Sequence, residues 1–328
     1  TGYSTAASEL EKLHGQHDII ELIETYRELE KLRNTYIDVL PKLINKKTNR
    51  IHTTFNQAVT TTGRLSSSEP NLQNIPIRTE LGKRVRDAFV AEKGNVLIAV
   101  DYSQIELRIV ASLAKDKNLI GIFERGEDVH KATAAILNDV SLEDVTKEMR
   151  SSAKAINFGV LYGMGVYGLA SRTGMSNYEA KEFIAKYFEK FKDVKKYLDN
   201  TIKFAKKEGY VETLFGRRRY IPEIKASNFQ LKAAGERMAI NMPVQGTAAD
   251  VMKMAMIEVS RKLKVESKKY KNDVRLILQV HDELVLEVKK GLEDEVSEIV
   301  KNAMENVVKL NVPVDVHVDV GKRWGELK

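Results

Sequence analysis

The segment RSSAKAINFGVLYG, residues 150–163, carries Arg150, Lys154, Phe158 and Tyr162 at every fourth position. On an α-helix this spacing places the four side chains along one face, in a row that drifts slowly around the axis. The row runs from two cations to two aromatic rings. A nucleoside triphosphate presents the matching order, from its anionic phosphates to its flat base. The segment therefore suggests a helix face on which such a ligand could lie.

The same segment carries features that an ordinary helix would avoid. We expect the helix to begin near Thr146, so both cations lie in its N-terminal half, where the helix dipole disfavours positive charge. A bound anion would offset that cost. Gly159 and Gly163 each lower helix stability by about 1 kcal/mol in a helix interior, which suggests that another group approaches the backbone closely. The alternative is an amphipathic helix with Phe158 and Tyr162 in a core, because periodicity alone reports mainly burial.

The composition sets limits on the class of protein. The chain has 328 residues, enough for two or three subdomains with cores of their own. Lysine and arginine total 53 against 46 acidic residues, and the resulting formal charge of +7 suits a polyanionic partner. The absence of cysteine excludes disulfides, thiolate metal sites and cysteine nucleophiles. No apolar run reaches membrane-spanning length and no signal peptide is evident, so we expect a soluble, intracellular protein.

The N-terminal quarter is predicted to pass from helix to hairpin to loop. Residue 1 is threonine, so we expect the chain to begin inside a longer one. Residues 1–47 read as mostly helical, and the threonine-rich, alternating residues 48–62 suggest a β-hairpin. Residues 62–78, TGRLSSSEPNLQNIPIR, read as a polar loop. Such a loop is either a plain surface connection or a binding loop, whose Arg64, Gln73 and Asn74 can donate to base edges and phosphates.

Residues 95–114, NVLIAVDYSQIELRIVASLA, predict a buried strand that ends at Asp101 and an amphipathic helix after it. A carboxylate at the end of a buried strand is a common position for a catalytic ligand, although Asp101 could also be a turn or cap residue. Ser103 and Glu106 have the S-x-x-E spacing of a capping box, which offers Glu106 a structural role. His130, in the helical residues 115–145, would more often be a solvated or internally bonded histidine than a ligand.

The next segments read mainly as scaffold. Residues 176–208 predict two amphipathic, lysine-rich helices. Residues 210–222 predict a hairpin whose turn carries Arg217, Arg218 and Arg219, either solvated or in contact with phosphate. Residues 261–273 read as a lysine-rich connection.

A polar row is predicted near the C-terminal third. Residues 232–258 read as two helices separated by a break at Pro243. Arg237, Asn241 and Gln245 recur every fourth residue there. This row suits hydrogen bonding along a groove, and a solvated helix face is the alternative.

Two further strands follow, and the turn between them is unusual. Residues 276–288, LILQVHDELVLEV, predict two apolar strands joined at His281, Asp282 and Glu283. A tight hairpin normally prefers Gly or Asn in its turn, so a turn built of acids and a histidine points to a functional site. Residues 312–321 read as a final strand.

Asp101 and Asp282, at the tips of two apolar strands, are the carboxylates that a two-metal phosphoryl-transfer site needs. Mg²⁺ prefers such oxygen ligands and keeps water and substrate phosphates in its shell. Two such ions, about 4 Å apart, stabilise the attacking and leaving oxygens of an in-line displacement. Together with the cationic helix face and the polar row, this pair predicts nucleotidyl transfer.

Three segments carry a resemblance to a known family. DYSQIELR (101–108), RSSAKAINFGVLYG (150–163) and QVHDE (279–283), in this order, resemble the three polymerase motifs of the family A DNA polymerases, the bacterial DNA polymerase I type. TGRLSSSEPNLQNIP and ERMAINMPVQGTAAD (236–250) match the family as well. The resemblance covers essentially the whole chain.

The resemblance implies an α+β, right-hand polymerase fold with an antiparallel-sheet palm, helical fingers and a partial helical thumb. Residues 1–47 would be the partial thumb, 48–106 the first part of the palm, 107–235 the fingers and 236–328 the second part of the palm. Domains for proofreading and 5′-nuclease activity are not expected in this chain. It would be a cytoplasmic monomer at the bacterial nucleoid, acting in DNA replication and repair without membrane contact.

The implied activity is that of a DNA-directed DNA polymerase. It would add dNTPs to the 3′-hydroxyl of a DNA primer in the 5′→3′ direction, copying a template and releasing pyrophosphate. Glu106 within DYSQIELR argues against a single-subunit RNA polymerase, and a non-catalytic relative would be expected to have lost an aspartate or Lys154. The remaining alternative is a catalytically impaired DNA-binding fragment, because the thumb would be incomplete.

The resemblance also assigns roles to single residues. Asp101 and Asp282 would bind two Mg²⁺ ions, which Mn²⁺ could replace, with the Tyr102 carbonyl as a further ligand. Glu283 would support this site, and Lys154 would protonate the departing pyrophosphate. The nucleotide-binding residues implied are Arg150, Lys154, Phe158, Tyr162, Glu106, Gln104 and His130. Among these, Phe158 would stack on the nucleotide and Tyr162 would occupy the template-base position. Glu106 would be the steric gate against a ribose 2′-hydroxyl. The DNA-binding residues implied are Arg64, Gln73, Asn74, Arg237, Asn241, Gln245 and His281.

Overall fold

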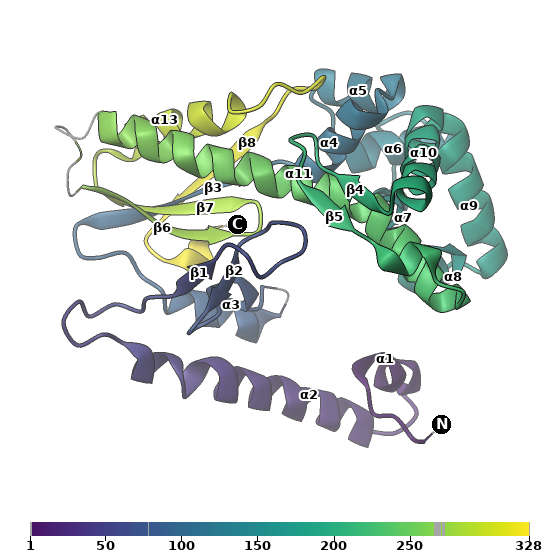
Figure 1. The fold of residues 1–328 in the computed structure, drawn as a ribbon. Coiled ribbons are helices and arrows are strands. Elements are labelled where there is room, and N and C mark those ends of the chain that lie inside the picture. The colour runs from purple at the N-terminus through teal and green to yellow at the C-terminus, as the bar shows by residue number, and fades with distance from the viewer. Residues whose placement is uncertain (1, 78, 266–269, 271–272, 328) are drawn as a thin grey trace.

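A four-stranded antiparallel sheet lies beside a large helical region in the computed structural model, which describes residues 2–77, 79–265, 270 and 273–327. Figure 1 shows the sheet on one side of the molecule, the helices α4 to α10 on the other, and the N-terminal helices beneath both. This arrangement confirms the predicted α+β class. No helix in the described ranges has the length and apolar character needed to cross a membrane.

The sheet is built around one apolar strand. Its order is β6–β7–β3–β8, and the strands are β3 (Asn95–Tyr102), β6 (Val274–Val280), β7 (Glu283–Lys289) and β8 (Val316–Gly321). Strand β3 is buried on both faces because its neighbours and two layers of packing cover it. The predicted strands at residues 95–101 and 276–288 are therefore confirmed.

The two faces of β3 belong to different hydrophobic clusters, since strand side chains alternate. Ile98 and Val100 belong to the larger cluster, together with residues of α11 (Phe229–Val265) and α13 (Glu293–Glu305). Leu97 and Ala99 belong to a second cluster that includes Trp324. Asp101 continues the second set, so its side chain lies on the face opposite α11 and α13.

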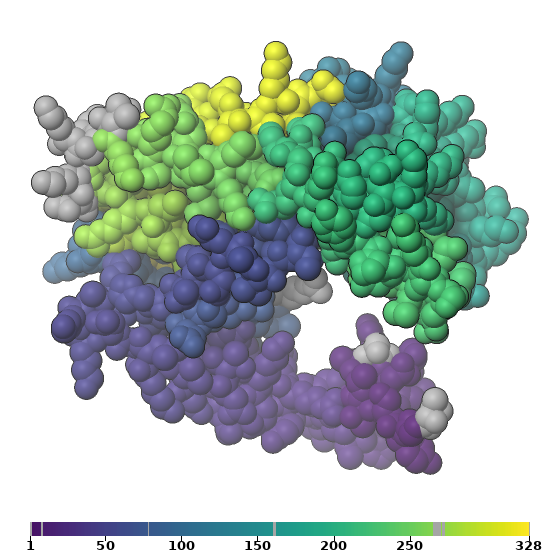
Figure 2. Space-filling view, viewed as in Figure 1, coloured from purple at the N-terminus to yellow at the C-terminus, as the bar shows by residue number. Residues whose placement is uncertain are grey.

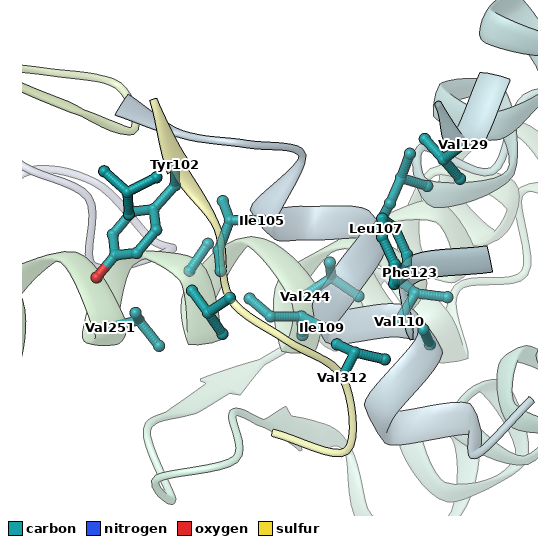
Figure 3. Packing of buried hydrophobic residues seen from close by; sticks show 14 of the residues in the cluster. Tyr102, Ile105, Leu107, Ile109, Val110, Phe123, Val129, Val244, Val251 and Val312 are labelled. Carbon is teal, nitrogen blue, oxygen red and sulfur yellow. The ribbon is translucent and has the colours of Figure 1, made fainter. Parts of the chain in front are cut away.

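The larger cluster fixes the junction between strand and helix. Figure 3 shows Tyr102 and Ile105 at this junction, with Val251 of α11 close to the Tyr102 ring. The Tyr102 hydroxyl also donates to the Met304 carbonyl oxygen at 2.8 Å. This packing holds the end of β3 in place and so fixes the position of Asp101.

The helical region follows the order predicted from the sequence. Its two lysine-rich helices at residues 177–190 and 192–208 confirm the prediction for residues 176–208. The helices of this region are α4 (Ile105–Ala114), α5 (Lys117–Glu124), α6 (Val129–Asn138), α7 (Lys147–Leu161), α8 (Val166–Thr173), α9 (Asn177–Lys190) and α10 (Lys192–Glu208).

The hairpin after α10 differs in detail from the prediction. Strands β4 (Tyr210–Glu212) and β5 (Arg218–Tyr220) form it, so Arg218 and Arg219 lie in a strand and only Arg217 lies in the turn. Arg218 stabilises the pairing of the two strands through side-chain contacts with β4. Its guanidinium lies 4.6 Å from the centre of the Tyr210 ring, and its Nε lies 3.1 Å from Glu212 Oε2. The short helix η5 (Pro222–Lys225) follows.

The predicted break at Pro243 is wrong, because α11 runs through it as one helix of 37 residues. A proline inside a helix costs about 3 kcal/mol through its missing amide and its ring. Met242 and Val244 are buried in two different clusters, and the Thr247 hydroxyl donates to the Pro243 carbonyl oxygen at 2.6 Å. Tertiary packing on both sides of the proline therefore outweighs its helix-breaking tendency.

The N-terminal residues are helical as predicted. Figure 2 shows an opening between these N-terminal helices and the helical region. Their elements are α1 (Ala7–Leu10), η1 (Glu11–Leu13), α2 (Ile19–Leu32), η2 (Arg33–Ile37) and η3 (Leu40–Leu43).

The hairpin predicted at residues 48–62 is shifted along the chain. Its strands are β1 (Thr54–Asn56) and β2 (Ser66–Ser68), so the second strand lies in the segment predicted as loop. The serines can form a strand because their hydroxyls find partners: Ser67 is buried and bonds the Thr53 hydroxyl at 2.7 Å. The short helices η4 (Leu72–Asn74), α3 (Glu80–Asp87) and η6 (Trp324–Glu326) complete this side. The connection predicted at residues 261–273 lies largely outside the described residues.

Candidate active site

Strand pairing brings together three carboxylates from two segments that are distant in the sequence. In the β3–β7 register, Asp101 pairs with Glu283, and the Tyr102 amide donates to the Asp282 carbonyl oxygen at 3.1 Å. The two-residue turn between β6 and β7 is possible because His281 adopts a left-handed φ of 52°. The sequence placed Asp101 and Asp282 at strand tips, and the structure places those tips side by side.

These carboxylates repel one another in a poorly solvated position. Burial, with the neighbouring charges of Glu283, Asp282 and Asp319, raises the pKa of Asp101 to about 7. Burial likewise raises the pKa of Glu283 to about 7, although Arg86 and the Trp324 indole act in the opposite direction. The region thus holds negative charge that a cation would stabilise.

The donor set at this position fits magnesium. Asp101, Asp282 and the backbone carbonyl of Tyr102 offer hard oxygen ligands, which Mg²⁺ prefers. Within the described ranges, no three His, Asp or Glu side chains are arranged to hold a metal ion by themselves. Mg²⁺ commonly completes its shell with water and substrate phosphates, so two carboxylates facing a substrate are a suitable protein contribution.

Glu106 is held from two sides rather than used as a cap. The Arg64 guanidinium donates to its Oε1 at 2.8 Å, and the Tyr162 hydroxyl donates to its Oε2 at 3.1 Å. The capping-box alternative is wrong, because Gln104 precedes α4 with a left-handed φ of 56° and makes no side-chain cap. Burial raises the pKa of Glu106, and Arg64 opposes that shift.

Arg64 also connects this group to the acidic turn. Its Nη2 lies 3.5 Å from Asp282 Oδ1, and its Nε is buried without a hydrogen-bond partner in the described part of the chain. One guanidinium therefore bridges the strand turn of Asp282 and the helix position of Glu106.

The row on α7 is present, and the helix begins at Lys147 as predicted. Lys154 is exposed, Phe158 is half-buried, and Tyr162 follows directly after the helix. Arg150 is already paired, since its Nη2 lies 2.7 Å from Asp128 Oδ2. Asp128, which was not singled out from the sequence, caps α6 by accepting bonds from the backbone amides of His130 and Lys131.

His130 is buried, so the solvated alternative considered from the sequence is wrong. Its Nδ1 lies 3.1 Å from the Asn157 amide nitrogen, which can only donate. The neutral ring must then carry its proton on Nε2, a buried atom with no partner among the described residues. Burial lowers the pKa of His130 to about 4, and Lys154 and Arg150 add to that shift. The ring packs 5.5 Å from Phe158, beside the α7 row.

The polar row on α11 lies against the end of α7. Arg237 is exposed, whereas Asn241 and Gln245 are half-buried. The Gln245 side chain opposes the burial that raises the pKa of Tyr162, and a Cβ on Gly163 would lie 2.8 Å from Arg237 Cγ. The rows predicted on two separate helices therefore meet at the position of Tyr162 and Gly163.

The remaining predicted residues are spread around this centre. Gln73 uses its amide nitrogen to bond Gln279, at 3.0 Å from both its carbonyl oxygen and its Oε1. Asn74 accepts a bond from the Tyr36 hydroxyl at its backbone carbonyl, at 2.7 Å. Gln104 and His281 are exposed, Gln104 before α4 and His281 in the β6–β7 turn.

Asp319, Arg86 and Trp324 also lie at this site and were not predicted from the sequence. Asp319 lies on β8 opposite Ala99, on the same face as Asp101. The alternation VDVHVDV in residues 314–320 could have shown that the polar residues share a face, but not which face. Trp324 is the sole tryptophan of the chain, and only the fold brings it beside Glu283.

Comparisons with known proteins agree with this arrangement. A family model described as DNA polymerase family A matches residues 1–326. The chain is 51% identical over 99% of its length to "DNA polymerase I, thermostable" of Thermus filiformis and 52% identical over its whole length to DNA polymerase I of Caldicellulosiruptor bescii. It spans 38% of the length of each of these relatives.

A solved structure is also similar in fold. It is described as the POL domain of Pol1 from M. smegmatis in complex with DNA primer-template and dNTP. The TM-score is 0.93 at 44% identity, covering 99% of this chain and 57% of that one. The predicted right-hand polymerase fold is thereby confirmed.

Proposed function

The chain belongs to DNA polymerase family A, and from that membership we propose that it extends a DNA primer by template-directed nucleotidyl transfer. The primer 3′-hydroxyl attacks the α-phosphate of an incoming dNTP, the chain grows in the 5′→3′ direction, and pyrophosphate leaves. The observation that carries this proposal is the strand pairing that places Asp101 beside Asp282 and Glu283. The reaction's substrates are a DNA primer-template duplex and dNTPs, the molecules named for the M. smegmatis structure.

Asp101, Asp282 and the Tyr102 carbonyl would hold two Mg²⁺ ions, which Mn²⁺ could replace. When bound, the ions stabilise charge on the attacking and leaving oxygens. The protein's own part is to fix two carboxylates at adjacent strand ends, where their mutual repulsion favours cation binding. Glu283 adds negative charge beside Asp101 in the β3–β7 register.

The α7 row would receive the nucleotide. Lys154 and Arg150 bind the triphosphate, and Lys154 donates a proton to the departing pyrophosphate. Because Arg150 is paired with Asp128, phosphate binding competes with an existing ion pair. The His130 Nε2–H is a buried donor that would contact a phosphate oxygen, and Gln104 would assist from the start of α4. Phe158, beside the His130 ring, would stack on the nucleotide.

Glu106 would serve as the gate that rejects a ribose 2′-hydroxyl. Its carboxylate is fixed by Arg64 and Tyr162, so it cannot swing away to admit an extra oxygen without breaking two hydrogen bonds. Tyr162 would occupy the template-base position until the helical region closes. Duplex contacts in the minor groove and at the primer terminus would come from Arg64, Gln73, Asn74, Arg237, Asn241, Gln245 and His281.

We assign the partial thumb to residues 1–47, the palm to 48–106 and 236–328, and the fingers to 107–235. The opening in Figure 2 lies between the N-terminal helices and the helical region and is the proposed duplex position. The protein would act as a cytoplasmic monomer in DNA replication and repair.

A second candidate is a DNA-binding fragment with impaired catalysis. The observation in its favour is an apolar stripe on α2, where Leu22 and Tyr26 are 67% and 63% exposed. Large apolar side chains exposed along one helix face suggest that the N-terminal helices are weakly supported and would hold the duplex loosely.

Primer extension tests the two candidates against each other. The parent chain and Asp282→Ala are given a primed DNA template, dNTPs and Mg²⁺, and duplex binding is followed in parallel by fluorescence anisotropy. Extension by the parent and none by Asp282→Ala is the expected result. No extension by either, with duplex binding retained, supports the impaired fragment. Equal extension by both would place the reaction elsewhere.

A further inference from the structure

The C-terminal turn η6 is held against the segment that follows α3. The Trp324 amide donates to the Phe89 carbonyl oxygen at 2.9 Å, and Val90 and Arg323 form an antiparallel bridge. Gly325 approaches α3 so closely that a Cβ there would lie 1.9 Å from Asp87 Oδ1. The end of the chain is therefore fixed to the element that carries Arg86.

The Trp324 indole lies under the sheet face that carries the carboxylates. It is 1% exposed and belongs to the cluster of Leu97, Ala99 and Val285, on the same face of the sheet as Asp101. The Arg86 guanidinium lies 4.3 Å from the centre of the indole ring. A cation stacked on tryptophan is attracted by the ring's electron-rich face, so the indole holds Arg86 in one place.

Both side chains act on Glu283. Glu283 lies two residues before Val285 on β7, so its side chain is on the sheet face against which Trp324 packs. The charge of Arg86 and the indole N–H of Trp324 also oppose the burial that raises the pKa of Glu283. Arg86 Nε, Trp324 Nε1 and Glu283 Oε1 are all buried, and none reaches a partner at full hydrogen-bond geometry in the ranges that the structure describes. The indole N–H therefore acts on the carboxylate as a nearby dipole rather than through a well-formed bond.

Two donors and one acceptor thus lie together below the active site without pairing fully. Buried polar groups left short of a partner lower stability, so they persist mainly where function requires them. We propose that Arg86 and Trp324 are positioning residues that hold the Glu283 carboxylate beside Asp101. The inference rests on the proposed function in so far as Glu283 serves nucleotidyl transfer.

The strand register explains why the Glu283 side chain must be held in position. Asp101 and Glu283 are directly opposite in an antiparallel pair, where like charges destabilise each other. Glu283 is the first residue of β7, next to a turn, and its side chain would otherwise relieve this repulsion by turning towards solvent. The charge of Arg86 and the dipole of Trp324 favour the inward position, which keeps the negative charge at the proposed metal site.

Three variants of the full chain test the inference in single-nucleotide incorporation at saturating primer-template. Arg86→Met removes the charge and keeps the length, and Trp324→Phe removes the N–H and keeps an aromatic ring. Phe89→Leu is the matched control, because Phe89 packs edge-on against the same indole at 5.5 Å. We expect the first two to lower kcat roughly tenfold, as loss of outer-sphere support commonly does, with the dNTP KM unchanged.

The control should stay within about twofold of the parent, and Arg86→Lys should recover part of the loss. In a Glu283→Gln background, Arg86→Met should add little, since a positioning residue has no effect without the group it positions. Equal losses in Arg86→Met, Trp324→Phe and Phe89→Leu would show a merely structural cluster and overturn the inference. Full activity in Arg86→Met and Trp324→Phe would overturn it while leaving the proposed function intact.

Trp324 supplies a readout that does not depend on activity, because it is the only tryptophan. Titration with MgCl₂ alone should change its emission in the parent, and the change should be at least halved in Arg86→Met and in Glu283→Gln. This result from a parent that fails to extend primers would support the positioning role and reject the proposed function. A parent emission that ignores Mg²⁺, or responds equally in Arg86→Met, would overturn the positioning role.

Discussion

The fold places single carboxyl groups where their charged form is disfavoured. Asp101 has a pKa of about 7 in the folded chain because burial and neighbouring acids disfavour its charged form. A carboxyl group whose pKa is raised on folding contributes stability at pH values below its unfolded pKa of about 4. That contribution is lost as the pH rises through 7, so this position should weaken the fold at neutral pH.

Asp101→Asn should therefore stabilise the chain at pH 8 and change little at pH 4. The gain should be on the order of 2 kcal/mol, because a pKa shift converts at 1.36 kcal/mol per unit and partial exposure screens it. Urea unfolding in EDTA at the two pH values measures it. Leu97→Val, on the same strand and face, should instead lower stability equally at both, and a pH-independent gain in Asp101→Asn would contradict the explanation.

Asp128→Asn should tighten dNTP binding. Asparagine caps a helix about as well as aspartate, so α6 should stay intact while Arg150 loses its ion pair. An exposed pair is worth about 0.2–1 kcal/mol, so the dNTP KM should fall by roughly 1.4- to 5-fold. Steady-state incorporation checks this, and Asp139→Asn, which removes the exposed pair with Lys186, should leave KM unchanged. An unchanged or higher KM in Asp128→Asn would argue against competition for Arg150.

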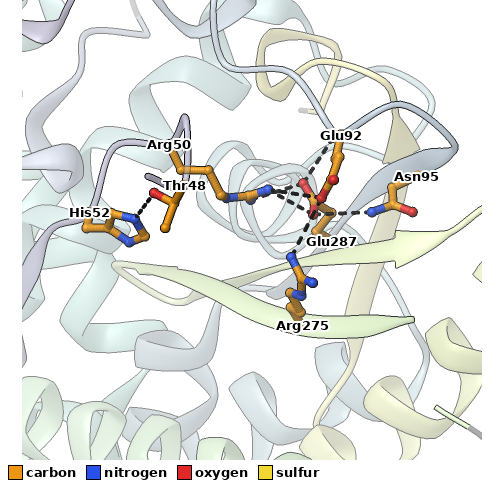
Figure 4. A network of polar contacts seen from close by, with 7 residues as sticks. All are labelled: Thr48, Arg50, His52, Glu92, Asn95, Arg275 and Glu287. Carbon is orange, nitrogen blue, oxygen red and sulfur yellow. Dashed lines mark hydrogen bonds and ion pairs between the residues drawn. The ribbon is translucent and has the colours of Figure 1, made fainter. Parts of the chain in front are cut away.

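At the scale of elements, one buried carboxylate ties the segment that carries Arg50 to the sheet. Figure 4 shows the side chains of Arg50 and Asn95 converging on Glu287 beside the strands of the sheet. Arg50 donates to both carboxylate oxygens of Glu287 at 3.1 Å, and Asn95 Nδ2 lies 3.3 Å from Oε1. Glu287 is 1% exposed, whereas its neighbour Glu92 is largely in solvent.

Glu287→Gln should destabilise the chain by roughly 2–4 kcal/mol, because it removes the buried carboxylate of the pair and leaves Arg50 with only the exposed Glu92 as a partner. Glu92→Gln, which disturbs only exposed pairs, should cost less than about 0.5 kcal/mol. Denaturant titration of both variants gives the comparison. Similar small losses in the two would mean that Arg50 is resolvated without penalty.

The helices and strands differ in how well the sequence predicted them. Periodicity located β3, α7 and the β6–β7 hairpin, because each is a local pattern of apolar side chains. It failed at Pro243 and at Ser66–Ser68, where distant packing and hydroxyl bonding override local preference. The individual roles of the site residues came from motif resemblance and stay predictions.

Several contacts between segments could not be predicted from the sequence. The ion pair of Arg150 with Asp128 joins two helices, and the bridge of Arg64 between Glu106 and Asp282 joins three segments. Trp324 reaches Glu283 only because the chain end returns to α3. Such pairings depend on the tertiary fold, which no local spacing encodes.

At the scale of the whole molecule, net charge should govern DNA affinity. The chain carries a formal charge of +7, and duplex binding that neutralises about four phosphates should weaken roughly 100-fold between 50 and 200 mM KCl. Fluorescence anisotropy with a labelled primer-template across this range measures the slope. An affinity that does not change with salt would contradict phosphate contact as the source of binding.

The continuous helix α11 has a consequence for recombination between relatives. It belongs at once to the cluster beneath the sheet and to the cluster around the β4–β5 hairpin. The proposed boundary between residues 235 and 236 falls inside it, so a crossover there would splice half a helix from each parent. Functional chimaeras should inherit all of α11 from one parent. Recombination during evolution should therefore exchange the segments that pack around α11 and leave the helix itself intact.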